Sequence, residues 1–130
     1  MTTSLINSLT ALSKDIGDYW ASTTDGAGSA TTMVDSALKA KANDWVTDYT
    51  YVILEEEPTS TAAIYDERKV SSLDNTSGTL TTLAFSEAPG TGIDYSLHRL
   101  FTPSDKRIAL IQATKLAYPY IFNRIKDKSK

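Results

Sequence analysis

The segment DYTYVILEEEP, residues 48–58, constrains the fold most, because it has the pattern of a strand with apolar side chains on both faces. Successive side chains of a strand point to opposite faces, and here both sets include aromatic or aliphatic residues. Such a strand needs neighbours on both edges and cover on both faces. It is therefore predicted to lie centrally in a sheet and to end at the acidic run before Pro58.

Four further segments have the residue types of strands, with turn-forming residues between them. In the segment 79–85 the apolar positions fall out of phase, which predicts a bulge at residues 81–82. The last two strands are expected to pair as the end of a β-meander. The small, glycine-rich segment 21–30 is predicted to be a turn or short linker. The four strand segments are 31–34, 61–73, 79–85 and 93–100.

The last strand alternates between apolar and polar residues. This period of two predicts one face toward the core and one toward solvent. His98, the single histidine of the chain, falls on the solvent side of this prediction. The residues predicted to face inward are Ile93, Tyr95 and Leu97, and those predicted to face outward are Asp94, Ser96 and His98.

Both ends of the chain have helical patterns. Residues 1–20 carry apolar side chains at steps of three and four, and Thr102 followed by Pro103 has the character of a helix start. Pro119 is expected to end or kink the second helix. The prediction is a single α+β domain, 1–130. A small antiparallel β-meander or partly closed barrel of about five strands (21–101) is flanked by an N-terminal helix (1–20) and a C-terminal helix and tail (102–130).

Charge and composition exclude several classes of partner and site. The net charge of -3 argues against binding to nucleic acid or to an anionic membrane surface. No apolar run reaches the ~18 residues that cross a bilayer, and the first residues lack the pattern of a secretory signal. Because the chain has no cysteine and one histidine, a disulfide framework and a zinc site are not expected.

Catalytic readings find weak support in the sequence. A Ser–His–Asp triad would need His98, but Asp94 lies four strand residues away, a separation of ~13 Å. Glu55 and Glu57 share a strand face at ~7 Å, which loosely resembles the carboxylate pair of a glycosidase. A hydrolase that uses Glu55, Glu57 or His98 is thus the weakest reading. We predict no catalytic residue, no metal site and no cofactor.

The apolar residues of the two terminal helices have two interpretations, as ordinary core or as arms that pack on neighbouring subunits. The acidic run at the end of the central strand is interpreted as a charged edge that faces solvent or a partner. The residues predicted to form an interface are Leu5, Leu9, Leu12, Ile16, Glu55, Glu57, Tyr118, Tyr120 and Phe122.

Three segments also carry a more specific pattern. GSATTMVDSAL fits G-x-x-T-T-x-V-D-S-x-L. GTLTTLAFSEA is similar to G-T-L-T-x-x-x-x-F-x-x-A, with one residue fewer before Phe85, and GIDYSLHR is similar to a strand of the type G-D-x-Y-x-L-H-R, with Ile93 between Gly92 and Asp94. Together with the closing segment KRIALIQATKLAYPYIFNRI, the chain resembles a β-module common in structural proteins of tailed bacteriophages, over roughly residues 26–125.

The resemblance implies a virion component at the neck, the head–tail joint or the tail. It implies a ring-like homo-oligomer that contacts other virion proteins, without nucleic acid or membrane as a partner. The chain could then be the anchoring part of a longer, fibre-like protein. The alternative is a small carbohydrate- or ligand-binding β-module, in which Trp45, Tyr49 or Tyr51 stacks on a sugar.

Overall fold

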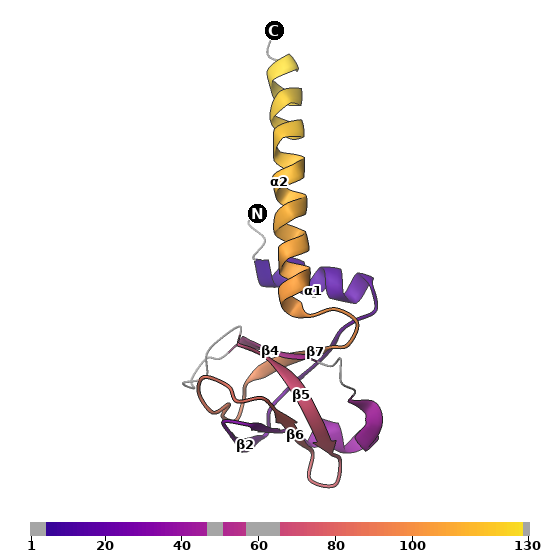
Figure 1. Ribbon diagram of the computed structural model, residues 1–130, viewed down its shortest axis with the longest axis vertical. Helices are drawn as coiled ribbons and strands as arrows, with labels where there is room; N and C mark the ends of the chain where they lie inside the picture. Colours follow the sequence, from indigo (N-terminus) through magenta and orange to yellow (C-terminus); the bar gives the residue numbers. More distant parts are fainter. Residues whose placement is uncertain (1–4, 47–50, 57–65, 129–130) are drawn as a thin grey trace.

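The computed structural model describes residues 5–46, 51–56 and 66–128 of the 130-residue chain, without the side chains of 6, 55, 56 and 118–128. These residues form a small sheet domain from which one long helix projects, while a second helix crosses the base of the first (Figure 1). The elements in chain order are α1 (Leu5–Asp15), β1 (Trp20–Thr23), β2 (Gly26–Ser29), β3 (Thr32–Val34), the 3-10 helices η1 (Ser36–Ala40) and η2 (Asn43–Trp45), β4 (Tyr51–Glu56), β5 (Glu67–Asp74), β6 (Thr79–Thr82), β7 (Asp94–His98) and α2 (Pro103–Lys128).

The described strands form one seven-stranded antiparallel sheet in the order β1-β7-β4-β5-β6-β3-β2. The prediction that the VILEE segment lies centrally is confirmed, because β4 pairs with β7 on one edge and β5 on the other. The two edge strands, β1 and β2, are joined by residues 24 and 25 alone. This short link draws the two ends of the open sheet together at one corner, consistent with a partly closed barrel.

Two sequence expectations about the sheet need correction. The glycine-rich segment 21–30 forms β1 and β2, and it belongs to a hairpin because Gly28 lets the backbone of β3 approach closely. A Cβ at Gly28 would lie 2.0 Å from the Thr32 carbonyl oxygen. The predicted bulge does occur at the level of residues 81–82, but its extra residue is in the partner strand, because Val70 and Ser72 of β5 pair with the consecutive residues Thr82 and Thr81 of β6.

The last strand, β7, does not pair with β6. The connection after β6 carries the chain to the far side of the sheet, where β7 lies between β1 and β4. The meander is therefore limited to β4, β5 and β6. The turn residues after β6 do not predict this crossover. The position of β7 depends on β1 and β4, which have open edges elsewhere in the sheet.

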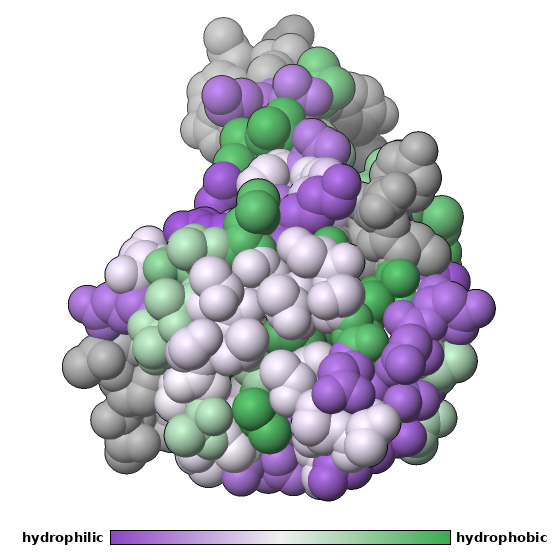
Figure 2. Space-filling model, turned by 60° about the horizontal axis from the view of Figure 1, so that its bottom comes forward, coloured by the Kyte–Doolittle hydropathy of each residue, from purple (hydrophilic) through white to green (hydrophobic). Residues whose placement is uncertain are grey.

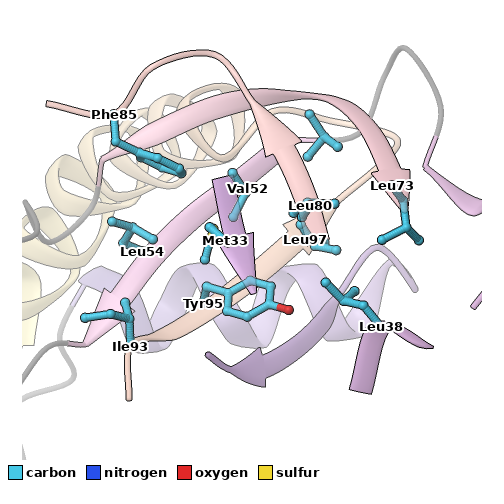
Figure 3. Close-up of a cluster of buried hydrophobic side chains, with 11 residues drawn as sticks. Met33, Leu38, Val52, Leu54, Leu73, Leu80, Phe85, Ile93, Tyr95 and Leu97 are labelled. Atoms are coloured by element: carbon cyan, nitrogen blue, oxygen red, sulfur yellow. The ribbon is translucent and has the colours of Figure 1, made fainter. Parts of the chain in front are cut away.

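The core lies inside the curl of the sheet and is made of aliphatic and aromatic side chains from most of its strands (Figure 3). The predicted inward residues of the last strand are confirmed, with Ile93, Tyr95 and Leu97 at most 4% exposed. The Tyr95 hydroxyl donates to Asp35 Oδ2 at 2.7 Å, and Asp35 Oδ1 accepts from the Ala37 backbone at the start of η1. A buried carboxylate thus links β7 to the first 3-10 helix.

The outward prediction for the same strand is wrong at two residues. Ser96 is fully buried and His98 is 1% exposed, whereas Asp94 is half-buried. The reason is that α1 and α2 contribute Ser13 and Lys106 against this face of β7. Alternation along a strand identifies two faces, but it does not show that the polar face is also covered.

The long helix begins as predicted. The Thr102 hydroxyl accepts from the Asp105 backbone N–H at 3.0 Å, and Pro103 occupies the first helical position. Of the two outcomes expected at Pro119, an end of the helix is excluded, since α2 continues to Lys128 (Figure 1). Proline removes the donor that the Lys115 carbonyl would accept from. Lys115 is exposed, so water can satisfy that carbonyl.

Candidate functional site

The best-defined cluster of titratable side chains joins α1, β7 and α2, and we call it the helix latch: Ser13, Asp18, His98 and Lys106. Lys106 reaches inward from the first turn of α2 and is 3% exposed. Its ammonium donates to Ser13 Oγ at 3.1 Å, the Asp18 carbonyl at 3.0 Å and His98 Nδ1 at 2.8 Å. It also pairs with Asp18 Oδ2 at 2.8 Å, so the buried charge is neutralised.

A glycine cap places Asp18 in the latch. Gly17 has a φ of 73°, and its N–H donates to the Lys14 carbonyl while the Asp18 N–H donates to the Ser13 carbonyl. These two bonds form the Schellman arrangement that ends a helix. A left-handed residue turns the chain sharply, and Asp18 then lies below the end of α1. This cap follows from a local signal, because glycine favours that conformation.

The Asp18 carboxylate also holds the connection between β7 and α2. Oδ1 accepts from the backbone N–H groups of Arg99 at 2.6 Å and Leu100 at 3.0 Å, and Oδ2 accepts from Phe101 at 3.0 Å. Burial raises the pKa of Asp18, but the Lys106 ammonium and these three N–H groups outweigh it. The net result lowers the pKa to about 2, which keeps Asp18 ionised under ordinary conditions.

His98 is neutral in this environment. Burial lowers its pKa, the adjacent Lys106 cation lowers it further, and Asp18 opposes the shift only in part, so the pKa falls to about 4. Because Lys106 can only donate, Nδ1 of His98 accepts and Nε2 carries the proton. Nε2 lies 2.9 Å from Ser96 Oγ, to which it donates. Ser96 is fully buried, so no nucleophile is presented to solvent by this cluster.

A second contact fixes the start of α2. Glu67 of β5 accepts from the Ser104 backbone N–H at 2.9 Å and from the Ser104 hydroxyl at 2.6 Å. A carboxylate at a helix N-terminus satisfies otherwise unpaired N–H groups and interacts favourably with the helix dipole. Two carboxylates from different parts of the chain therefore fix the base of α2 on the sheet domain.

The outer length of α2 has the opposite character. Ile108 is 50% exposed, Ile111 40% and Leu116 80%. Residues on the other side of the helix, Pro103 and Lys106, are buried against the domain. The helix therefore has an inner face that docks and an outer surface on which large apolar side chains meet solvent.

The predicted interface residues of α1 differ in how exposed their side chains are. Leu9 of α1 is buried and Leu12 is half-buried, whereas Leu5 and Ile16 are exposed. The side chains of the other predicted residues lie outside the described part of the chain. Glu55 lies in β4 and Tyr118, Tyr120 and Phe122 lie in α2, but their side chains, and all of Glu57, are outside the described residues.

A hollow of about 270 Å³ lies beside the latch, between the turn after α1, the β1–β7 pair and η2. Trp45 is half-buried and lines this hollow together with Trp20. The Lys41 ammonium lies 4.9 Å from the Trp45 ring centre and 5.4 Å from that of Trp20. The two indoles meet edge to face at 5.2 Å, so a cation of the chain itself already covers both rings.

Sequence reasoning missed Asp18 and Lys106, and it assigned His98 to solvent. Gly17 was the one local signal that pointed here, because it marks where α1 ends. Among the described residues, no three His, Cys, Asp or Glu side chains converge as metal ligands would. Asp25 accepts from the Ser36 backbone N–H at 3.0 and 3.1 Å.

No protein-family model matches the sequence, and no curated protein matches it. Within the part of the chain that the structure describes, no helix is both long and apolar enough to span a bilayer.

Proposed function

We propose that this protein is a structural component of a tailed-bacteriophage virion, in which the sheet domain docks at the neck, head–tail joint or tail and copies assemble symmetrically. The observation that carries this proposal is the projecting helix α2. It is fixed to the domain at its base, and it exposes Ile108, Ile111 and Leu116 beyond that base. Large apolar side chains on a projecting element favour burial against a further chain.

The three motif segments of the phage resemblance also meet in space. The Asp35 N–H donates to the Gly78 carbonyl at 3.0 Å, and Tyr95 donates to the Asp35 carboxylate. Gly78 has a φ of 75°, and a Cβ there would lie 2.5 Å from the Asp35 carbonyl oxygen. These motif residues thus depend on one another physically, which supports reading them as one structural module.

The sheet domain has a surface suited to polar docking. On its face away from α2, residues of intermediate hydropathy occupy most of the middle, and apolar residues lie between them in small groups (Figure 2). Such a surface is suited to bind a partner protein through many hydrogen bonds, as the polar rim of a protein–protein interface does. In the proposed arrangement the domain contacts its virion neighbour and α2 contacts other copies.

Three measurements test the proposal. Light scattering after size exclusion should give a mass that is a multiple of the 14.2 kDa chain. Mass spectrometry of purified virions should detect the chain, and antibody labelling in electron micrographs should place it at the neck or tail. A chain that is absent from virions would contradict the virion assignment, whatever its mass in solution.

The hollow beside the latch favours one second candidate, the small carbohydrate- or ligand-binding module. Its tryptophan walls have the residue type that stacks on sugar rings, and its volume is near the lower end of small-ligand sites. Titration with neutral oligosaccharides should then change the tryptophan fluorescence, and Trp45→Ala should abolish the change. An unchanged spectrum across a panel of monosaccharides and oligosaccharides would exclude this candidate.

A further inference from the structure

We infer that the outer stripe of α2 forms the core of a parallel coiled coil of at least three copies of this chain. The outer stripe is the set of residues spaced by three and four from Ile108: Ile108, Ile111, Lys115, Tyr118, Phe122 and Ile125. The inference deepens the proposed function and rests on it, because it names the face and the occupant through which copies would assemble.

The outer stripe lies away from the face that docks on the domain. At about 100° per residue, Pro103, Lys106 and Leu110 occupy one sector of the helix, about 140° from the midpoint between Ile108 and Ile111. Pro103 and Lys106 are buried and Leu110 is half-buried, whereas Ile108 and Ile111 are 50% and 40% exposed. Ile108 and Ile111 are therefore not part of the core of their own domain.

The spacing of the stripe indicates another helix as the occupant. Its six residues recur at intervals of 3, 4, 3, 4 and 3, and five of them are aliphatic or aromatic. This period of 3.5 is the pattern of helices that pack along their whole length against each other, with Ile108 at position a and Ile111 at position d. The backbone of α2 is helical across the full stripe.

The identities at the core positions point to copies of this chain and to their number. Isoleucine at both a and d favours three or four strands over two. A lysine at a single a position, here Lys115, is tolerated at a cost in stability and limits the possible registers. A self-assembled bundle needs no other protein, because every copy presents the same stripe and the same lysine.

The orientation follows from the docking role of the domain. In a parallel bundle all sheet domains lie at one end, where they can contact a common surface of the virion. An antiparallel pair would direct them to opposite ends, and only one of the two domains could reach that surface. Parallel packing also gives the closed rotational symmetry common in homo-oligomers.

A matched pair of charge substitutions tests the stripe. Ile111→Asp places a carboxylate in the core of the bundle, whereas Leu116→Asp places one at a site about 110° from the midpoint between Ile108 and Ile111. Leu116 is the more exposed of the two, at 80% against 40%. We expect the wild type and Leu116→Asp to have a mass of about 43 kDa or more, three times the chain mass, and Ile111→Asp to fall to 14.2 kDa.

Single cysteines test the orientation, because the natural chain has none. Disulfides form only when the Cα atoms approach within about 7 Å, and a parallel, in-register bundle brings identical core positions together. Under mild oxidation, Ile111→Cys should give a covalent dimer on a non-reducing gel and Leu116→Cys should remain a single chain. The reverse pattern, or no linkage from Ile111→Cys, would overturn the parallel arrangement.

The outcomes separate this inference from the proposed function. A multimer that survives Ile111→Asp would overturn the outer stripe as the contact and leave the assembly proposal standing. A wild-type chain that stays monomeric at the highest attainable concentration would overturn the self-assembled bundle, and virion labelling would then test docking separately. Near-ultraviolet circular dichroism of the tryptophans should be unchanged in both aspartate variants, which shows that the sheet domain remains folded.

Discussion

The base and the outer length of α2 both depart from the usual rule that charged side chains are exposed and apolar side chains are buried. At its base the helix buries the charged Lys106, and along its outer length it exposes Ile108 and Ile111. The difference is in the available partners. The base meets the Asp18 carboxylate and the acceptor nitrogen of His98, whereas Ile108 and Ile111 are 50% and 40% exposed.

This contrast shows that burial of a residue depends on what satisfies it. A buried ammonium is tolerated only when a counter-charge and hydrogen-bond acceptors surround it. An exposed isoleucine is tolerated on any surface, but a spaced row of them favours association. The base of α2 should therefore respond strongly to substitutions in the monomer, and the outer stripe should respond only in the assembly.

The largest effect is expected from Asp18→Ala, which leaves the Lys106 ammonium buried without its counter-charge. Removing one partner of a buried ion pair costs about 3–5 kcal/mol in the free energy of unfolding. Urea denaturation measures this change. Asp105→Ala, in the exposed first turn of the same helix, serves as the control and should change stability by less than about 1 kcal/mol. Equal losses in the two variants would contradict the latch.

The second-largest effect is expected from acid, which should weaken the attachment of α2 to the sheet domain. The pKa of His98 is lowered from its usual 6.5 to about 4, so the unfolded chain takes up its proton first as the pH falls. The full stability is therefore present above pH 6.5 and declines as the pH falls toward 4, by roughly 3 kcal/mol. His98→Gln should flatten this decline in denaturation curves measured from pH 7 to 4. A decline of the same size in that variant would assign it to other groups.

A further loss is expected at lower pH from Asp18. Its pKa is lowered from 3.8 to about 2, so its contribution is present above 3.8 and is lost as the pH falls toward 2. Below pH 3.8 the decline should continue in His98→Gln but be smaller in Asp18→Asn. His98 and Asp18 thus lose their contributions to stability at different pH values, which separates these two members of the latch.

A smaller effect is expected from Gly17→Ala, which strains the cap that places Asp18. The cost of a left-handed alanine is about 1–2 kcal/mol. Gly92→Ala is the matched control, since both glycines have positive φ and an added Cβ meets nothing within 4 Å at either site. We expect similar losses in unfolding free energy. Only Gly17→Ala should also shift the acid midpoint of the latch, measured by the same pH series.

The smallest effect on the monomer is expected from Ile111→Asp. At dilutions where the chain is a single copy, its unfolding free energy should lie within about 0.5 kcal/mol of the wild type, because the side chain contacts solvent. Lys115→Ile should raise the midpoint of thermal dissociation of the assembly without changing this monomer value. A large loss of monomer stability in Ile111→Asp would place the stripe in the core and remove the contrast.

Several features were accessible from the sequence because their causes are local. Asp35 caps η1 and Thr102 caps α2 through hydrogen bonds to residues two and three positions away. The central strand was predictable because β4 is apolar on both faces, and Val52, Ile53 and Leu54 are all buried. Pro119 does not end α2, because the carbonyl that loses its donor belongs to the exposed Lys115.

The candidate site was less accessible because its members are distant in the sequence. Lys106 contacts the Asp18 carbonyl across 88 residues, and no local pattern distinguishes Lys106 from the other lysines of the chain. His98 was misassigned because alternation in β7 does not reveal that α1 and α2 cover its polar face. The hollow beside the latch was also inaccessible from the sequence, because only the tertiary structure brings Trp20 and Trp45 together.

The sequence by itself determined where the chain turns, caps and alternates, since those preferences arise from each residue's own backbone and its nearest neighbours. Only the tertiary structure decided that a lysine would be buried and two isoleucines exposed on the same helix. The physical reason is that desolvation is a property of the surroundings, and those surroundings are assembled from strands and helices far apart in the chain.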